Sequence, residues 1–444
     1  MTIDRVLSVG LPSLGRDGGN ALSATAGNPA EKVSPQEEVA PERAKTTALR
    51  VVGRVQSRRT QPAQSGARNN FSLVDENMKE IQKHVDVIDE EEQERLCDYV
   101  KLLKSAETEK AELAAISDRL KELLRAKGRE YHHGWRREDR DRRKSLLHSI
   151  QSLVLFAEAR RTNNVELNRR LHFLGRGNKA TVYSYRSQNG GRWAFKELPK
   201  SNWREDGWDA IANLVAHSLC NLLAARGAPC PMIQVFPAVV NGKIGLAMPI
   251  APGKTLRKFP SDRAFWKSSS FRRQETWLQI LDCIGGETDR YVRNVFWDEK
   301  TEALTAIDSD RSFSLSRECP TIRWNPVTKE GRPQQYCIPP VIDTDMRAVI
   351  EELSETELRK CLGEIGLFSE QIDAACTRLK ALKRHNFYVI TPNQWADDDL
   401  LREGGCTDTN CCFLLHWQQS LAIRKGLRVR RGEDYLTGTW PSGY

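Results

Sequence analysis

The fold of this chain is decided by the stretch Gly286–Asn294, GETDRYVRN, together with AIDSD at Ala306–Asp310. Asp289 is followed five residues later by Asn294, and Asp308 comes after a short apolar segment that is typical of a hairpin. This layout is typical of a phosphoryl-transfer site, where one carboxylate handles the acceptor hydroxyl while an amide and a second carboxylate hold Mg²⁺. We therefore expect Asp289 to orient the acceptor and accept its proton, and Asn294 and Asp308 to coordinate the metal.

Two further residues of this stretch carry charges that such a site can use. Asp310 is a second acid two positions after Asp308, so the two carboxylates share one face if the chain stays extended there. Asp310 is therefore a third candidate metal ligand, and Arg290 is a candidate partner for an acid that holds the loop. The alternative interpretation is a polar connection between a helix and a strand.

A matching front half lies upstream of this stretch. Gly175 and Gly177 open the segment GRGNKATV, which ends at Val182, and Lys196 follows in the apolar strand segment WAFK. Glycines between two strands let backbone amides approach phosphate oxygens, and a lysine in an apolar setting needs a negative partner such as those phosphates. Gly175, Gly177, Val182 and Lys196 are thus candidate nucleotide-binding residues. An exposed lysine on an edge strand is the alternative for Lys196.

The sequence leaves the carboxylate partner of Lys196 open. In such a site the partner comes from the next helix, where Glu205 is the one candidate and lies at the predicted helix start. Asn213 lies where the partner is more naturally expected. Glu197 should point away from the site, because neighbours on a strand alternate between its two faces.

The segment Leu246–Gly253, LAMPIAPG, follows a predicted strand and ends in proline and glycine. It favours a hinge between two lobes, whose backbone would bind adenine, and Met248 is the candidate residue there. A turn on the solvent side is the alternative.

In this order the segments resemble the protein-kinase-like superfamily, although neither His-Arg-Asp nor Asp-Phe-Gly is present. Residues 285–294 and the segment Ile307–Phe313, IDSDRSF, are similar to the atypical branch that contains actin-fragmin kinase, type II phosphatidylinositol 4-kinases and related bacterial effector kinases. Tyr291 and Ser309 depart from that branch, which commonly has His and Asn there. The resemblance spans about 168 to 390.

The resemblance implies a bilobal protein-kinase-like fold of the α+β class that uses ATP and Mg²⁺. It implies a kinase that transfers phosphate to an alcohol group, with Ser or Thr of an unidentified host protein as the leading acceptor. A phosphoinositide or inositol kinase is one alternative. The other is a catalytically inactive kinase fold used as a binding scaffold, which the departures at Tyr291 and at the lysine's partner motivate.

Composition divides the rest of the chain. Residues 1–70 are rich in Gly, Ser, Ala, Pro, Gln and Arg, which predicts a disordered leader. That leader resembles the export signal of bacterial type III secreted effectors, which implies action in the host cytoplasm and a secretion chaperone as a further candidate partner. Apolar residues at threes and fours predict a helical region over 71–165. The catalytic domain is expected over 166–390 and a C-terminal extension over 391–444.

Charge and hydropathy argue against two classes of protein. The net charge of +9 is not gathered in one long basic tract, so we expect no nucleic-acid partner. No apolar run reaches the length of a membrane span, so we expect no stable membrane insertion. Eleven scattered cysteines favour a reducing environment, and a zinc site at Cys406, Cys411, Cys412 and His416 is a minor alternative.

Overall fold

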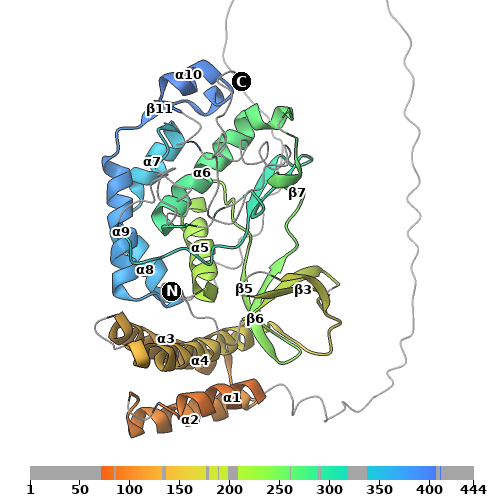
Figure 1. Cartoon of the computed structure of the whole chain (residues 1–444), viewed down its shortest axis with the longest axis vertical. Coiled ribbons are helices and arrows are strands. Elements are labelled where there is room, and N and C mark those ends of the chain that lie inside the picture. The colour runs from red at the N-terminus through yellow and green to blue at the C-terminus, as the bar shows by residue number, and fades with distance from the viewer. Residues whose placement is uncertain are drawn as a thin grey trace, which may run out of the picture. The chain divides into compact units, whose positions relative to one another are not determined.

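The computed structural model describes residues 72–84, 87–132, 137–176, 180–188, 190–198, 209–260, 262–288, 290, 292–317, 338–406 and 411. Within these residues helices and strands are mixed, which confirms the α+β class (Figure 1). The predicted leader lies outside the described residues, as do Gly177, Glu205, Asp289 and Tyr291. No helix of the described part is both long and apolar enough to cross a membrane.

The region before the first strand is helical, as predicted, although the sequence suggested two or three helices. The described helices there are α1 (Ser72–Ile81), α2 (Glu90–Lys104), α3 (Lys110–His132) and α4 (Arg137–Arg161). The side chain of Asp89 caps α2 by accepting a hydrogen bond from the Glu92 amide at 2.8 Å. Helices α3 and α4 pack side by side (Figure 1), and α4 also packs against the sheet that follows.

A buried carboxylate fastens α3 to α4. Glu158 on α4 accepts hydrogen bonds from Lys121 at 2.8 Å and Ser117 at 2.6 Å, both on α3, and pairs with Arg161 at 2.8 Å. Burial alone would raise the pKa of Glu158, but the charges of Lys121 and Arg161 and the hydrogen bonds lower that pKa to about 2. The group is therefore charged in the folded protein at neutral pH.

The first sheet has six strands in the order β1-β5-β6-β4-β3-β2. Their bounds are β1 (Val165–Glu166), β2 (His172–Arg176), β3 (Thr181–Arg186), β4 (Arg192–Glu197), β5 (Phe236–Val240) and β6 (Lys243–Pro249). The dipeptide Asn241-Gly242 predicts a hairpin turn, and it joins β5 to β6 with both residues at positive φ, 51° and 77°. Such φ values match the twist of a two-residue hairpin, so the prediction from Asn-Gly is confirmed.

Strand register fixes which side chains share a face of this sheet. Val182, Lys196 and Leu246 are directly paired across β3, β4 and β6, so they lie on one face. The neighbouring residue Glu197 points to the other face, where its carboxylate pairs with Lys243 at 2.7 Å. The expectation that Glu197 points away from Lys196 is confirmed.

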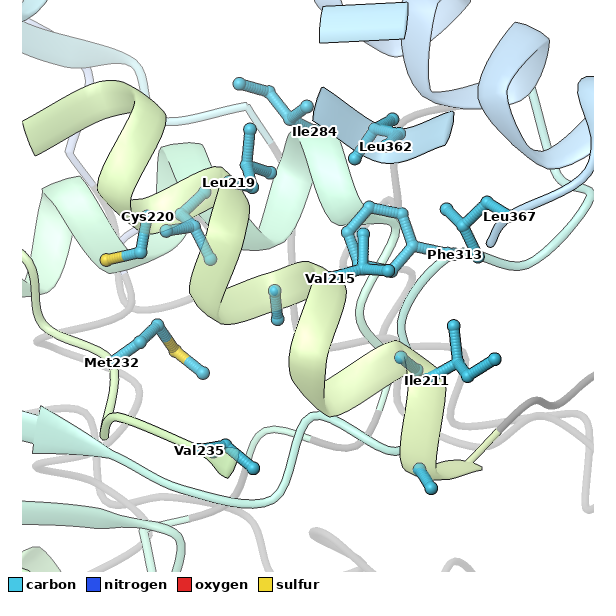
Figure 2. Close-up of a cluster of buried hydrophobic side chains, with 14 of the residues drawn as sticks. Ile211, Val215, Leu219, Cys220, Met232, Val235, Ile284, Phe313, Leu362 and Leu367 are labelled. Atoms are coloured by element: carbon cyan, nitrogen blue, oxygen red, sulfur yellow. The ribbon is translucent and has the colours of Figure 1, made fainter. Parts of the chain in front are cut away.

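The remaining long helices share an apolar core. The core contains Val215 and Leu219 of α5, Ile284 of α6, Leu362 of α8, and also Phe313, all buried (Figure 2). The helices are α5 (Asp209–Ala224), α6 (Ser269–Gly285), α7 (Thr344–Glu352), α8 (Glu355–Ile365) and α9 (Ser369–Arg384). The sequence itself predicts helices near 206–225, 271–283 and 344–385, and helices are present in all three ranges.

A second sheet has three strands, one of which precedes α6 in the chain while the other two follow it. Strands β8 (Val295–Asp298) and β9 (Ala303–Ala306) form the hairpin predicted between Asn294 and Asp308, and β7 (Lys254–Thr255) pairs with β8. The parallel pair β10 (Val341–Asp343) and β11 (Tyr388–Ile390) was not predicted. Strands of three residues are too short to show a period of two.

The proposed hinge segment runs from β6 of the first sheet to β7 of the second. Gly253 has a φ of +73° and lies directly on the backbone of Trp297 in β8. A Cβ atom at this position would overlap the Trp297 carbonyl group. The chain can cross between the two sheets here only because residue 253 has no side chain.

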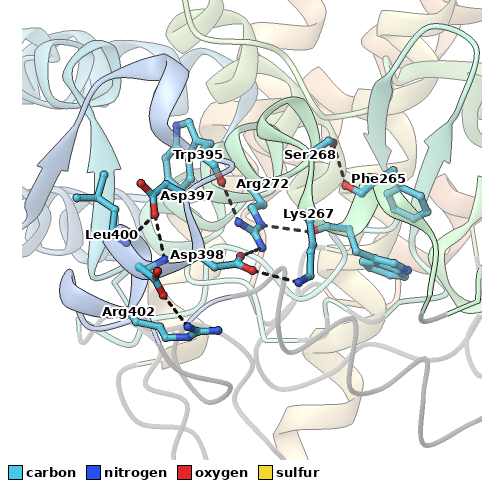
Figure 3. Close-up of polar contacts among 11 residues, drawn as sticks. Phe265, Lys267, Ser268, Arg272, Trp395, Asp397, Asp398, Leu400 and Arg402 are labelled. Atoms are coloured by element: carbon cyan, nitrogen blue, oxygen red, sulfur yellow. Dashed lines mark hydrogen bonds and ion pairs between the residues drawn. The ribbon is translucent and has the colours of Figure 1, made fainter. Parts of the chain in front are cut away.

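The first part of the predicted C-terminal extension is attached to the start of α6 (Figure 3). Arg272 donates to the Trp395 carbonyl at 3.0 Å and to the Asp398 carboxylate at 2.5 Å, and Lys267 pairs with Asp398 at 3.1 Å. Asp397 caps the short helix α10 (Asp398–Glu403) by accepting from two of its amides. These contacts continue the fold to at least Cys406.

Gly253→Ala should destabilise the protein by at least about 2 kcal/mol. The new residue would have to keep a positive φ, and its Cβ atom would overlap the backbone of Trp297. Gly363→Ala is the matched control, since Gly363 lies inside α8 and its Cβ would meet only Ile372 at 3.8 Å. That change should be neutral or stabilising by about 0.5–1 kcal/mol. Urea unfolding measures both, and equal effects would contradict the assigned role of Gly253.

Glu158→Gln should destabilise the protein at pH 7 and much less in acid. The folded pKa of Glu158 is about 2, below its ordinary value of 4.5, so its contribution to stability is present above pH 4.5 and is lost as pH falls toward 2. This lowering of the pKa corresponds to a contribution of about 3 kcal/mol to the free energy of unfolding at neutral pH. Urea unfolding of both proteins at pH 7 and near pH 3 tests this, and a difference that does not shrink in acid would refute it.

Candidate functional site

Lys196 brings the two halves of the predicted site together. Its Nζ atom forms an ion pair with Oδ1 of Asp308, 112 residues away in the sequence, and lies 3.7 Å from Oδ2 of Asp310. The exposed fractions of the three side chains are 18%, 35% and 10%, so the group is partly screened from water but reachable. Three residues predicted from two separate motifs therefore meet at one place.

The backbone at Asp308 differs from the expected extended chain. Asp308 follows β9 in the left-handed conformation, with φ of 63°, and a turn begins at Asp310. The expectation that the two acids share the face of an extended strand was therefore wrong. Instead, a left-handed residue, which Asp tolerates better than most, turns the chain so that both carboxylates reach Lys196.

Arg290 is a buried residue that binds several segments of this site. Its side chain is 0% exposed and forms two hydrogen bonds to the Asp282 carboxylate of α6, at 3.0 and 2.9 Å. It also donates to the Ile307 carbonyl at 2.6 Å and to the Ser309 hydroxyl at 2.8 Å. Arg290 thus joins α6, the loop that contains Asp289 in sequence, and the residues on both sides of Asp308.

Helix α5 holds the same loop from another side. The side-chain oxygen of Asn213 accepts a hydrogen bond from the backbone amide of Ser309 at 2.9 Å. Both residues are buried. Asn213, at the position where a partner for the lysine was expected, therefore orients the Asp308 loop, while the carboxylates seen at Lys196 are those of Asp308 and Asp310.

Asn294 lies beside this loop at the start of the hairpin. Its carbonyl accepts a hydrogen bond from the Ile307 amide at 2.8 Å, and the residue is 5% exposed. Because Ile307 directly precedes Asp308, the hairpin holds Asn294 next to the Asp308 loop. The short hairpin predicted between Asn294 and Asp308 is confirmed.

Further hydrogen bonds join the segment after α6 to the segment after β9. Glu287 accepts a hydrogen bond from the Ser312 hydroxyl at 2.7 Å, and both residues are buried. The Phe313 amide donates to the Gly285 carbonyl at 2.5 Å, with the Phe313 ring in the core. The segment after α6 and the segment after β9 are therefore held together along their length.

The predicted nucleotide-binding residues lie on the first sheet as far as they are described. Gly175 pairs with Val182 across β2 and β3, and Val182 pairs with Lys196. Met248 pairs with Ala194, two residues before Lys196, so it lies on the same face as the lysine. A Cβ atom on Gly175 would meet no protein atom within 4 Å. Gly177 and Asp289 lie outside the described residues.

Sequence reasoning named Arg290 but missed its partners Asp282 and Ser309. A signal for Asp282 was available, since it is a charged residue within the apolar run LQILDCIG of α6. A carboxylate on a buried helix face needs a paired charge. The contact with Ser309 depends on the left-handed turn at Asp308, which no local pattern indicates.

The candidate metal ligands near Lys196 are the carboxylates of Asp308 and Asp310, and the backbone of Asn294 lies beside the Asp308 loop. In the described part of the chain, no group of three or more His, Cys, Asp or Glu side chains is placed to hold a metal ion. The minor zinc alternative falls partly outside the described residues, since only Cys406 and Cys411 of its four candidates are described. No protein-family model matches this chain, and no curated protein matches its sequence significantly.

Arg290→Met should destabilise the protein by about 3–5 kcal/mol, because it leaves the buried Asp282 carboxylate without its main counter-charge. The double change Arg290→Met with Asp282→Leu removes both charges and should recover part of that loss. Denaturant unfolding of the two single variants and the double variant measures the coupling. Additive effects would show that the two side chains do not act as a pair.

Proposed function

We propose that the chain is an ATP- and Mg²⁺-dependent phosphotransferase with a bilobal kinase-like fold. The observation that best supports this is the meeting of Lys196 from β4 with Asp308 and Asp310 from the loop after β9. A phosphoryl-transfer site needs a lysine that binds the phosphates and, beside it, acids that bind the metal ion. These groups come from separate parts of the chain.

The donor set fits Mg²⁺. Asp308, Asp310 and Asn294 offer hard oxygen ligands, which Mg²⁺ prefers, and the two carboxylates already compensate a cation, the Lys196 ammonium. These three residues would hold the metal. A Mg²⁺ ion held there would neutralise negative charge that develops on the phosphates of ATP during transfer.

The remaining roles are assigned from strand register for the residues of the first sheet and from the sequence for Asp289. Lys196 would turn from the two carboxylates toward the phosphates of ATP. Val182 and Met248 share that face and would contact the adenine, and Gly175 leaves room for phosphates near the β2–β3 turn. Asp289 would take the proton of the acceptor hydroxyl, next to the anchored Arg290.

The acceptor and the place of action rest on the sequence alone. A Ser or Thr hydroxyl of a host protein is the acceptor that the resemblance favours. Delivery into a host cell by a type III system rests on the composition of residues 1–70. Both stay predictions that a phosphoproteome comparison of expressing cells would test.

Asp308→Asn should lower phosphate transfer at least about a hundredfold, because it removes a metal-binding charge. Asn tolerates the left-handed conformation of residue 308, so the backbone of the loop is retained. Purified protein is incubated with labelled ATP, Mg²⁺ and host lysate, and label in proteins is counted. Lys196→Met should show a similar loss.

Asp373→Asn is the matched control, since Asp373 forms an exposed ion pair with Arg359 at 2.6 Å on α8 and α9. Such pairs contribute little to stability, so this variant should transfer phosphate as the native protein does. A thermal shift with ATP and Mg²⁺ separates binding from chemistry. If the native protein shows no thermal shift with ATP and Mg²⁺ and transfers no label, these results would contradict the proposed function and favour a binding scaffold.

A further inference from the structure

Two cysteines lie against each other beside the candidate site. Cys220 is on α5 and is buried, while Cys230 is exposed in the segment between α5 and β5. Both are free thiols, and their Sγ atoms are 2.6 Å apart. A disulfide bond is about 2.05 Å long, so very little movement would join these two sulfur atoms.

We propose that Cys220 and Cys230 form a thiol–disulfide exchange site that reacts with small-molecule disulfides such as oxidised glutathione and closes into an intramolecular cross-link. This proposal does not rest on phosphotransferase activity. It rests on the sulfur contact and on the difference in exposure between the two thiols.

The two thiols have different roles in the exchange. The contact with Cys220 lowers the pKa of Cys230, whereas burial, followed by the contact with Cys230, raises the pKa of Cys220 well above its usual value. Cys230 is therefore both the more accessible and the more readily ionised thiol. A thiolate is the attacking species in disulfide exchange, so Cys230 reacts first.

The reaction proceeds in two balanced steps. The Cys230 thiolate attacks one sulfur of the small disulfide, whose S–S bond breaks, and one small thiol leaves with a proton from water. The Cys220 thiol then loses its proton and attacks Sγ of Cys230, which releases the second small thiol. Two protein thiols are oxidised to one disulfide, and one small disulfide is reduced to two thiols.

The cross-link would join two elements that both hold the Asp308 loop. The segment after Cys230 pairs with β9, since the Ala306 amide donates to the Pro231 carbonyl at 2.6 Å and the Ile233 amide to the Ala306 carbonyl at 2.9 Å. The Met232 sulfur lies 3.8 Å from Nη2 of Arg290. Figure 2 shows Met232 on this segment and Cys220 on α5, the helix whose Asn213 binds Ser309.

Other cysteines provide internal comparisons within the same protein. Cys283 and Cys376 are buried, and burial raises the pKa of Cys361 to about 12. These thiols should react slowly with a small disulfide. Reaction at Cys230 can therefore be distinguished from general oxidation of exposed or unfolded protein.

The test uses the full-length protein, reduced, freed of reductant and then treated with oxidised glutathione at neutral pH. Trypsin cleaves after Arg226, which places Cys220 and Cys230 in different peptides. Mass spectrometry should find the peptide that contains Cys220 linked to the peptide 227–243, and reduction should separate them. Modification of other cysteines without this linked pair would overturn the proposal.

Two variants test the order of the steps. Cys220→Ser should stop after the first step and accumulate glutathione on Cys230. The Cys230→Ser variant should react with oxidised glutathione at a rate at least about tenfold lower than that of the native protein, so that Cys220 stays unmodified. Cys361→Ser is the control and should form the cross-link as the native protein does. Circular dichroism checks folding, and Cys220→Ala replaces Cys220→Ser if the buried hydroxyl unfolds the chain. Equal reaction of Cys220 and Cys230 in the two variants would overturn the assigned roles.

Discussion

The buried pair of Arg290 and Asp282 is the constraint on which the site depends. Both side chains are essentially inaccessible to water, so neither charge can be satisfied by solvent. Removing one partner of such a pair lowers the free energy of unfolding by far more than the intact pair contributes to it. The loop must therefore keep Arg290 at the end of α6. From that fixed point the guanidinium reaches the Ile307 carbonyl and the Ser309 hydroxyl, which determines where Asp308 lies.

The sheet and the loop meet through one lysine. Register places Lys196 of β4 between Val182 of β3 and Leu246 of β6, and the left-handed turn at Asp308 brings two acids to its ammonium. Each half is held independently, the strand by its neighbours and the loop by Arg290 and Asn213. The alignment of the halves therefore depends on the folding of the whole described domain.

Local patterns predicted much of this structure because they report local physics. Asn241-Gly242 indicated its hairpin, and helical periodicity indicated α5 and α6, since turn residues and apolar spacing act over a few positions. The sequence also placed Lys196, Asn294 and Asp308 in one candidate site through the order of motifs. It did not predict the positive φ of Asp308 or the partner of Lys196, because both depend on contacts between distant segments.

The neutral amide at Asn213 has a consequence for the local charge balance. It secures the Ser309 amide without adding a further negative charge beside the acids. Lys196 contributes one positive charge and Asp308 and Asp310 two negative charges, which leaves these three side chains with an excess of one negative charge. A third carboxylate, contributed by α5, would double that excess. The group is thus close to neutrality on its own and gains from one additional positive charge nearby.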